Sequence, residues 1–389
     1  MGVWQPASIV YDQLHELVNV ARRLKCVMAR SFFALLTGAC ALVAPPGRFA
    51  VPSTRLQSLA EVVVQDPTMG ATLLSPFAQQ INDELEKRFG AAETARVREA
   101  WRLMDVDYVH KEALIEGHEY MKQEARSYLP GLTPMPFWDL TTTAWAQELE
   151  ANWEVVRDEF RAVAMDDADN LKKKGNNVWV AAADSDSAAS YGPDWRTLVL
   201  MDRTTWDPTN CNLFPKTAKL LSDAGVPCVE AFFASMTPNS KIAPHTDSCN
   251  FVLTSHLGLD IPPDCHITVG DETRYWKDGQ VTMFDTSIFH DAVNDSDEYR
   301  YILMLRVWHP ELTDTERAAL QFLFDVLDVP DLVSDDPVAV FAAEAELAGL
   351  RTRPEERAKL APSAAKPKKN KKGGKKKKKG KAAGFGVAL

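Results

Sequence analysis

Residues 281–310 read "VTMFDTSIFHDAVNDSDEYRYILMLRVWHP", two short apolar runs separated by a polar stretch rich in Asp and Asn. The same texture begins after "KKKGNNV" (172–178) and continues through runs such as "VEAFFASM" (229–236) and "NFVLTSHLGL" (250–259). Short apolar runs bounded by turn residues are typical of antiparallel β-structure of the sandwich or jelly-roll type. We therefore expect residues 171–312 to form such a domain within an α+β protein.

The segments on both sides of this region have helical periodicity. Residues 53–170 carry apolar residues at three- and four-residue spacing, and one long stretch, 93–128, follows this pattern throughout. His110 and His118 lie on that stretch and are expected to be ordinary packing or surface residues. Helical spacing returns in residues 313–360.

The two ends of the chain differ in composition from the rest. Residues 1–52 contain an apolar run from Ser31 to Ala44, which is short for a membrane span but suits a signal peptide. If this leader targets the chain, the protein enters the secretory pathway or an organelle; if the run is a buried helix instead, the protein is cytoplasmic. Residues 361–389 are rich in lysine and predict a disordered tail, which is either simply solvated or contacts anionic surfaces.

Composition and charge limit the class of protein. The chain has 389 residues, 46% hydrophobic and 25% charged, which is ordinary for a globular protein. Eleven lysines between residues 366 and 381 hide a net charge of −21 in the rest of the chain, against −10 for the whole. An acidic body argues against nucleic acid as the substrate. The six cysteines include no C-x-x-C pair, so neither a disulfide framework nor a zinc finger is indicated.

Two histidines and an aspartate are spaced as metal ligands. His245 and Asp247 form an H-x-D pair at the end of an expected strand, where alternate side chains project to the same side. His290 follows just past another expected strand, and two histidines with one carboxylate form a facial triad that leaves open positions on Fe(II). The alternative is that each histidine is an ordinary hydrogen-bonded loop residue.

Two more residues are candidates for binding a keto acid at such a metal. Arg300, inside the next strand, offers the forked donor that suits a carboxylate, and His256 offers a second donor. The alternative for Arg300 is a surface pair with Asp297 or Glu298. For His256 it is a core histidine with satisfied hydrogen bonds.

Several ordered blocks of sequence resemble the aspartyl/asparaginyl β-hydroxylase family of Fe(II)- and 2-oxoglutarate-dependent oxygenases. They are "YLPGLTPMPFWD" (128–139), "LEANWEVVRDEF" (149–160), "DWRTLVL" (194–200), "FPKTAKLL" (214–221), "PHTDSCN" (244–250), "HLGLDIP" (256–262), "WKDGQVTMFDTSIFHDAVNDSDEYR" (276–300) and "VWHPELT" (307–313). The resemblance implies a double-stranded β-helix fold. It implies that His245 and His290 bind Fe(II), and that Arg300 and His256 contact the carboxylate of 2-oxoglutarate.

Two departures from the family pattern bear on the chemistry. Animal members have glycine two places after the first histidine, where this chain has Asp247, so the carboxylate of the triad is present here. The family also has arginines, associated with an acidic substrate side chain, where this chain has Val252 and Thr254. Aspartate or asparagine as the hydroxylated residue is therefore in doubt.

The function we expect is hydroxylation of a side chain in a peptide, protein or amino acid. Two alternatives remain open: the same chemistry on a free small molecule, and a non-catalytic binding protein on this fold. Asp285 and Asp291 flank His290 and are either supports of the metal site or solvated turn residues.

Overall fold

The computed structural model describes residues 74–164, 180–181, 195–247 and 249–351. The expected leader and the lysine-rich tail therefore lie outside the described residues. The helices are α2 (Pro76–Phe89), α3 (Ala95–Asp105), α4 (Ala144–Ala151), α5 (Trp153–Ala164), α7 (Pro208–Leu213), α8 (Pro215–Asp223), α9 (Asp314–Asp328), the 3-10 helix η3 (Pro330–Val333) and α10 (Pro337–Arg351). The strands are β1 (His110–Ala113), β2 (Lys122–Ala125), β3 (Phe137–Trp138), β4 (Val180–Ala181), β5 (Trp195–Asp202), β6 (Thr205–Trp206), β7 (Cys228–Met236), β8 (Ser240–His245), β9 (Val252–Asp260), β10 (Cys265–Val269), β11 (Glu272–Tyr275), β12 (Val281–Phe284), β13 (His290–Asn294) and β14 (Arg300–Trp308).

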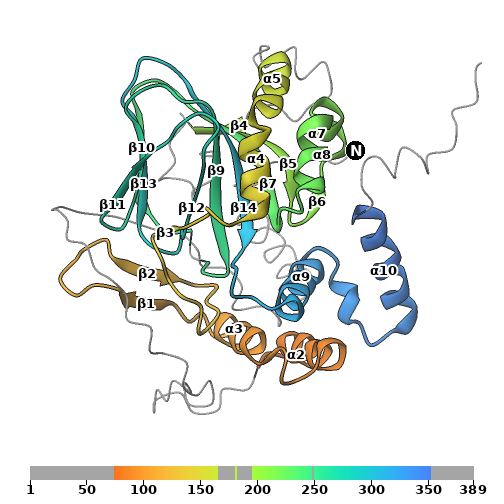
Figure 1. The fold of residues 1–389 in the computed structure, drawn as a ribbon. Helices are drawn as coiled ribbons and strands as arrows, with labels where there is room; N and C mark the ends of the chain where they lie inside the picture. Colours follow the sequence, from red (N-terminus) through yellow and green to blue (C-terminus); the bar gives the residue numbers. More distant parts are fainter. Residues whose placement is uncertain (1–73, 165–179, 182–194, 248, 352–389) are drawn as a thin grey trace, which may run out of the picture. The chain divides into compact units, whose positions relative to one another are not determined.

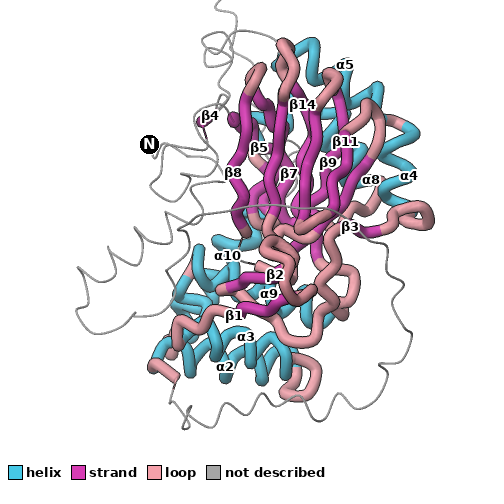
Figure 2. Tube along the Cα trace, turned by 90° about the vertical axis from the view of Figure 1, so that its left-hand side faces the viewer, coloured by secondary structure: helices cyan, strands magenta, loops and turns pink. Residues whose placement is uncertain are grey.

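Two antiparallel sheets face each other across a buried interior. The larger has the order β3-β12-β9-β14-β7-β5-β4, with β6 paired to β5, and the smaller has the order β11-β10-β13-β8. Figure 1 shows the smaller sheet on one side of the larger sheet and helices α4, α5, α7 and α8 on its other side, and Figure 2 shows the long central strands side by side. This is the double-stranded β-helix that the sequence predicted.

Strand β14 shows why the central strands read as nearly unbroken apolar runs. Leu303 and Leu305 pack in the cluster between the large sheet and its helices, whereas Ile302 and Met304 pack in the cluster between the two sheets. Successive side chains of a strand point to opposite faces, so a strand buried on both faces must be apolar at every position. Any charged side chain on the inner face of such a strand is therefore exceptional.

Aromatic packing and one carboxylate fix the helices on the outer face of the large sheet. The ring of Phe233 lies 4.9 Å from that of Phe160 and 4.7 Å from that of Phe214, between their centroids. Glu159 of α5 accepts hydrogen bonds from the backbone amides of Lys216 and Thr217 at 2.9 and 2.7 Å. These are amides at the start of α8, so a negative charge also favours the positive end of that helix dipole.

The prediction of a helix over residues 93–128 is wrong in its second half. Helix α3 ends at Asp105, Asp107 has φ of 56°, and β1 and β2 then form an antiparallel hairpin. A residue in the left-handed region cannot continue a right-handed helix. Tertiary contacts stabilise the hairpin instead, because Glu124 donates its backbone N–H to the carbonyl of Ser287 at 2.8 Å.

The two histidines of this segment are a packing residue and a surface residue, as expected. His110 stacks on Tyr128 with ring centroids 3.6 Å apart, and the exposed His118 pairs with Asp271. Within the described residues neither belongs to a metal-binding group.

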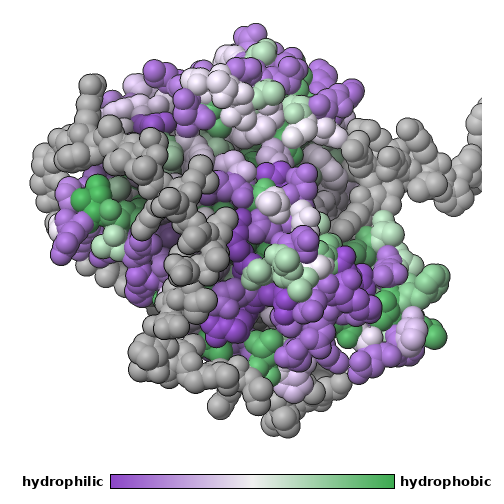
Figure 3. All heavy atoms as spheres, turned by 60° about the horizontal axis from the view of Figure 1, so that its bottom comes forward, coloured by the Kyte–Doolittle hydropathy of each residue, from purple (hydrophilic) through white to green (hydrophobic). Residues whose placement is uncertain are grey.

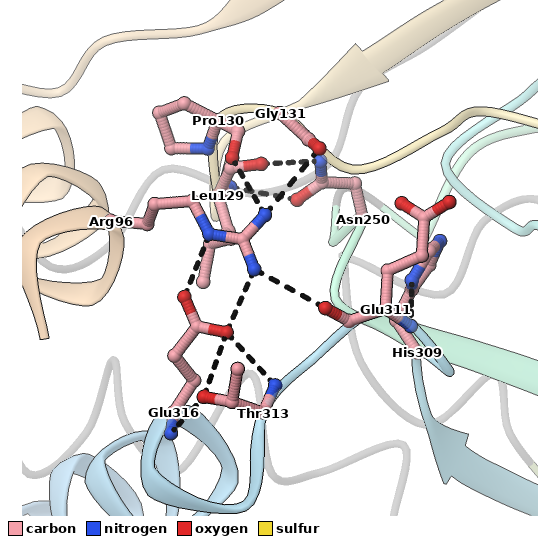
Figure 4. A network of polar contacts seen from close by, with 9 residues as sticks. All are labelled: Arg96, Leu129, Pro130, Gly131, Asn250, His309, Glu311, Thr313 and Glu316. Carbon is pink, nitrogen blue, oxygen red and sulfur yellow. Dashed lines mark hydrogen bonds and ion pairs between the residues drawn. The ribbon is translucent and has the colours of Figure 1, made fainter. Parts of the chain in front are cut away.

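Arg96 and Asn250 hold the segment around Leu129 from two sides (Figure 4). Arg96 of α3 donates two hydrogen bonds to Glu316 of α9, each 2.7 Å long, and two longer ones to the carbonyls of residues 130 and 131. Asn250, just before β9, bonds both the amide and the carbonyl of Leu129, at 2.8 and 3.0 Å. The segment around Leu129 is thereby held between the helices and the loop that follows β8.

Helix α10 has an apolar surface. Val338 and Phe341 are 75% and 74% exposed, and Figure 3 shows the corresponding apolar patch near its right edge. No helix among the described residues has the length and apolar character needed to cross a membrane.

Candidate active site

Strand pairing brings together two histidines that lie far apart in the sequence. His245 ends β8, His290 begins β13, and the two residues are direct partners in the antiparallel pairing of these strands. Their ring centroids are 4.2 Å apart. The loop after His245 returns toward the same place, because Asp247 donates its backbone N–H to the carbonyl of Thr286 at 2.8 Å.

Within the described residues, these three side chains form a group that could hold a metal ion. One ligand atom from each of His245, Asp247 and His290 lies within 4.8 Å of the others, and all three residues are buried. The three side chains are therefore close enough to be candidates for one shared ion. Two imidazoles and one carboxylate also match the donor set of mononuclear Fe(II) oxygenase sites, so the residues present fit such a metal.

Backbone carbonyls orient both imidazole rings. The Nδ1 of His245 lies 2.9 Å from the carbonyl oxygen of Ala243, and the Nδ1 of His290 lies 3.0 Å from that of Ile288. With Nδ1 as the donor, Nε2 carries the lone pair, and this arrangement is the usual one for metal-binding histidines. Burial, and then the neighbouring His245, lower the pKa of His290 to about 3, so its ring is neutral near pH 7.

Asp247 is held by an arginine that the sequence analysis did not identify. Its Oδ2 accepts a hydrogen bond from Nη1 of Arg306 at 2.6 Å, and its Oδ1 lies 3.7 Å from Nε2 of His245. Arg306 in turn lies opposite Glu230 in the pairing of β14 with β7, with Nε 3.9 Å from Oε2. Burial raises the pKa of Glu230 to about 7, although the charge of Arg306 opposes this.

A signal for this pair exists in the sequence. Arg306 interrupts the apolar run "YILMLRVW" (301–308), and Glu230 interrupts "VEAFFASM" (229–236). Charged residues inside runs that are buried on both faces require partners, because an unpaired buried charge is costly. Sequence alone does not reveal that the two residues share one row of the sheet.

Arg300 is buried without a carboxylate partner among the described residues. It is 1% exposed, its Nε and Nη1 have no hydrogen-bond partner, and its guanidinium lies 4.6 Å from the ring centroid of Trp276. Burial lowers its pKa to about 10. The alternative of a surface pair with Asp297 or Glu298 is therefore wrong.

His256 lies in the same interior with both ring nitrogens unsatisfied. It is 6% exposed and packs between Trp276 and Phe284, with ring centroids 5.7 and 4.9 Å away. Burial, and then the charge of Arg300, hold its pKa well below the usual value, so the ring is neutral. The alternative of a satisfied core histidine is wrong, because neither nitrogen has a hydrogen-bond partner in the part of the chain that the structure describes.

The unsatisfied nitrogen atoms of Arg300 and His256 are suited to binding an acidic ligand. A buried cation and a neutral imidazole supply donors that a carboxylate can accept, and a carboxylate would also balance the charge. The residues present therefore fit a carboxylate-bearing cosubstrate such as 2-oxoglutarate. Trp276 adds its indole nitrogen, Nε1, which also has no hydrogen-bond partner.

Asp285 and Asp291 occupy different environments. Asp285 is 1% exposed, and its Oδ1 accepts hydrogen bonds from the backbone and hydroxyl of Ser287, at 2.9 and 2.5 Å. Burial raises its pKa to about 7, so it is not a solvated turn residue. Asp291 is only partly buried on β13, where burial also raises its pKa.

Comparison with known proteins gives one consistent family. Residues 150–310 match the family model described as aspartyl/asparaginyl beta-hydroxylase. The human protein named aspartyl/asparaginyl beta-hydroxylase is 32% identical over 206 residues, which cover 49% of this chain and 25% of the human protein. Aspartate beta-hydroxylase domain-containing protein 2 of Xenopus tropicalis is 29% identical over 210 residues, which cover 51% of this chain and 53% of that protein.

A solved structure overlaps with a smaller part of the chain. The oxidoreductase of the 2OG-Fe(II) oxygenase family from Burkholderia pseudomallei is 13% identical with a TM-score of 0.23, over 29% of this chain and 65% of that protein. The assignment of the fold rests on the strand pairing described above and not on this overlap. The match to the human relative spans about a quarter of that protein, so the activity of the whole relative does not transfer directly.

Proposed function

Since residues 150–310 match the aspartyl/asparaginyl β-hydroxylase family, we propose that this chain is an Fe(II)- and 2-oxoglutarate-dependent hydroxylase of a side chain in a peptide, protein or amino acid. The observation that carries the proposal is the pairing of two features in one interior. One is the buried His-Asp-His group. The other is the buried Arg300 without a carboxylate partner in the described part of the chain, beside a histidine with two unsatisfied nitrogens.

The metal and the cosubstrate together supply the oxidation: one oxygen atom of O₂ enters the substrate as a hydroxyl group, and the other enters 2-oxoglutarate, which becomes succinate and CO₂. His245 and His290 would hold Fe(II) through Nε2, and Asp247 through a carboxylate oxygen. Both rings have Nδ1 bonded to backbone carbonyls, so Nε2 is the nitrogen of each ring that is left for a metal.

Arg300 and His256 would bind and orient the cosubstrate. The guanidinium supplies two donors and a fixed charge to the carboxylate remote from the metal, and the imidazole supplies a third donor. Trp276 and Phe284 pack against these residues and exclude water, which strengthens each polar contact. The positions of these side chains on long paired strands make the binding groups rigid before the ligand arrives.

Two measurements on the purified chain test the proposal. Fe(II) is titrated anaerobically, and succinate formation from 2-oxoglutarate is then followed in air with and without a library of peptides. We expect tight Fe(II) binding that is lost in His245→Ala, and succinate release that rises when an acceptable peptide is present. A chain that binds Fe(II) no better than His245→Ala, or that releases no succinate with or without peptide, would contradict the proposal.

A further inference from the structure

We propose that Arg306 is a positioning residue of the metal site: it holds Asp247 so that one carboxylate oxygen faces the two histidines, and Glu230 holds Arg306 from the other side. This inference rests on the proposed function, because it concerns the geometry of the same site. It adds two residues, on strands β14 and β7, to which neither the sequence analysis nor the resemblance gave a role.

Asp247 stands on a less constrained part of the backbone than the two histidines. Its side chain projects from the loop after β8, whereas His245 and His290 stand on paired strands. A ligand on a loop needs a second contact to keep its orientation. The hydrogen bond from Arg306 at 2.6 Å is such a contact, and it is charge-assisted and therefore strong.

The two carboxylate oxygens of Asp247 have different neighbours. It occupies Oδ2 of Asp247, while Oδ1 lies on the side of His245, 3.7 Å from Nε2. The carboxylate is therefore divided, with one oxygen for the arginine and the other for the metal. A single carboxylate donor beside two histidines keeps the open metal positions that a cosubstrate and oxygen require.

The position of Arg306 on the inner face of β14 requires charged partners. Arg306 is 7% exposed on the inner face of a strand whose other inner residues include Ile302 and Met304. Burying a guanidinium there is costly without partners. Asp247 and Glu230 supply them, and β14 is paired along its length with β7 and β9, so the arginine has a rigid base.

Metal affinity measures the effect directly. We expect Arg306→Gln to raise the Kd for Fe(II), measured anaerobically without cosubstrate, by about 10- to 100-fold, the range found when a partner of a metal ligand is removed. Arg306→Lys, which keeps the charge but not the fork, should recover part of that loss. The visible absorption of bound Co(II), which reports ligand geometry, should change in Arg306→Gln.

Two further variants separate positioning from folding. The double variant Arg306→Gln/Glu230→Gln removes one positive and one negative charge, so it replaces the single variant if that variant does not fold. It should show the same loss of Fe(II) affinity. Arg157→Gln is the matched control, because Arg157 of α5 is also a largely shielded arginine paired with carboxylates, including Asp158 at 2.9 Å. It should leave Fe(II) affinity and the Co(II) spectrum unchanged.

A double-mutant cycle decides the mechanism. If Arg306 acts through Asp247, then Arg306→Gln should change the Kd by less than about twofold in an Asp247→Gly background. An equal loss in both backgrounds, or parent-like Fe(II) affinity in Arg306→Gln, overturns this inference and leaves the proposed function standing. A parent chain that binds no Fe(II) overturns both.

Discussion

Replacing Arg300 by glutamine should have opposite effects on the free and the ligand-bound protein. The guanidinium is 1% exposed and has no carboxylate partner within the described residues, and burial lowers its pKa from the ordinary 12.5 to about 10. A difference of one in pKa corresponds to about 1.4 kcal/mol, so the charged group carries a penalty of about 3 kcal/mol in the folded protein. Arginine is charged in the folded and unfolded chain below pH 10, so this penalty persists near neutral pH and is relieved only as the pH rises through about 10.

The free Arg300→Gln variant should therefore be at least as stable as the parent. Part of the gain is offset by the lost contact with the Trp276 ring, 4.6 Å away, which is worth about 2 kcal/mol when it is desolvated. The net expectation is an increase of about 1 kcal/mol in the free energy of unfolding without cosubstrate. This is unusual for a core substitution, since most of them destabilise.

The bound variant should lose the stabilisation that 2-oxoglutarate confers. A hydrogen bond to a charged group contributes about 1.5–3 kcal/mol, which corresponds to a roughly 10- to 150-fold rise in the Kd of the cosubstrate. At 100 times the parent's Kd, the ligand stabilises the parent by about 2.7 kcal/mol and should stabilise the variant by only about 0.3–1.3 kcal/mol.

Thermal melting of the Fe(II) protein under anaerobic conditions, with and without 2-oxoglutarate, measures both effects. Arg274→Gln is the matched control, because Arg274 also lies over an aromatic ring, 4.1 Å from the centroid of Phe137, but is exposed. The control should melt like the parent in both conditions. A full ligand-induced shift of the melting temperature in Arg300→Gln would refute the assignment of Arg300 to the cosubstrate.

Four smaller perturbations address the metal, its pH response, the helical joint and the substrate. Asp247→Gly should raise the Kd for Fe(II) by about tenfold or more in an anaerobic titration; an unchanged Kd would mean that two histidines suffice. His290 has a folded pKa of about 3, so the unfolded chain binds the extra proton between about pH 6.5 and pH 3 and stability falls with acidification in that window. The free energy of unfolding is measured by urea denaturation near pH 7 and about pH 4. Between these two pH values it should fall by about 3 kcal/mol less in His290→Asn than in the parent. An equal fall in both proteins would contradict this. Burial opposes ionisation of Glu316, but the hydrogen bonds from Arg96 and Thr313 and the charge of Arg96 together outweigh burial and lower the pKa, so Glu316→Gln should reduce the free energy of unfolding by about 1.5–3 kcal/mol near pH 7, as measured by urea denaturation. Matched peptides with aspartate or asparagine at the reacting position should differ in kcat/KM by less than about tenfold, and a strong preference for aspartate would contradict the charge argument given below.

The sequence predicted the central strands β7, β9 and β14 well because these strands are buried almost throughout their length. Runs such as "RYILMLRVW" (300–308) leave few alternatives, and the turns between them are marked by Asp, Asn and Gly. The pairing of β8 with β13 could not be predicted in this way, because the spacing of residues in the sequence does not determine which distant strands pair. The resemblance supplied that information, and the direct pairing of His245 with His290 explains why 44 intervening residues do not separate them.

The failures have two physical causes. The hairpin of β1 and β2 was missed because its stabilising contacts come from far along the chain, including the bond between Glu124 and Ser287. Arg306 was missed because its role depends on a row of the sheet: Glu230 lies opposite it on one side and Thr254 on the other. Neither relation is visible until the register of three strands is known.

That row also bears on the substrate. At positions 252 and 254 the family that this chain resembles has arginines, which are associated with an acidic substrate side chain. This chain has Val252 and Thr254 there. Arg306 does bring a guanidinium next to Thr254 on the adjacent strand. Its charge is already matched by Asp247, with which it forms an ion pair of 2.6 Å, and Glu230 lies 3.9 Å from its Nε. The row of Glu230, Arg306 and Thr254 therefore has no unpaired positive charge. Such a row does not favour a carboxylate over an uncharged group of similar size, because specificity requires that the site interact differently with the two groups. The hydroxylated side chain is therefore expected to be chosen by shape and hydrogen bonding rather than by negative charge.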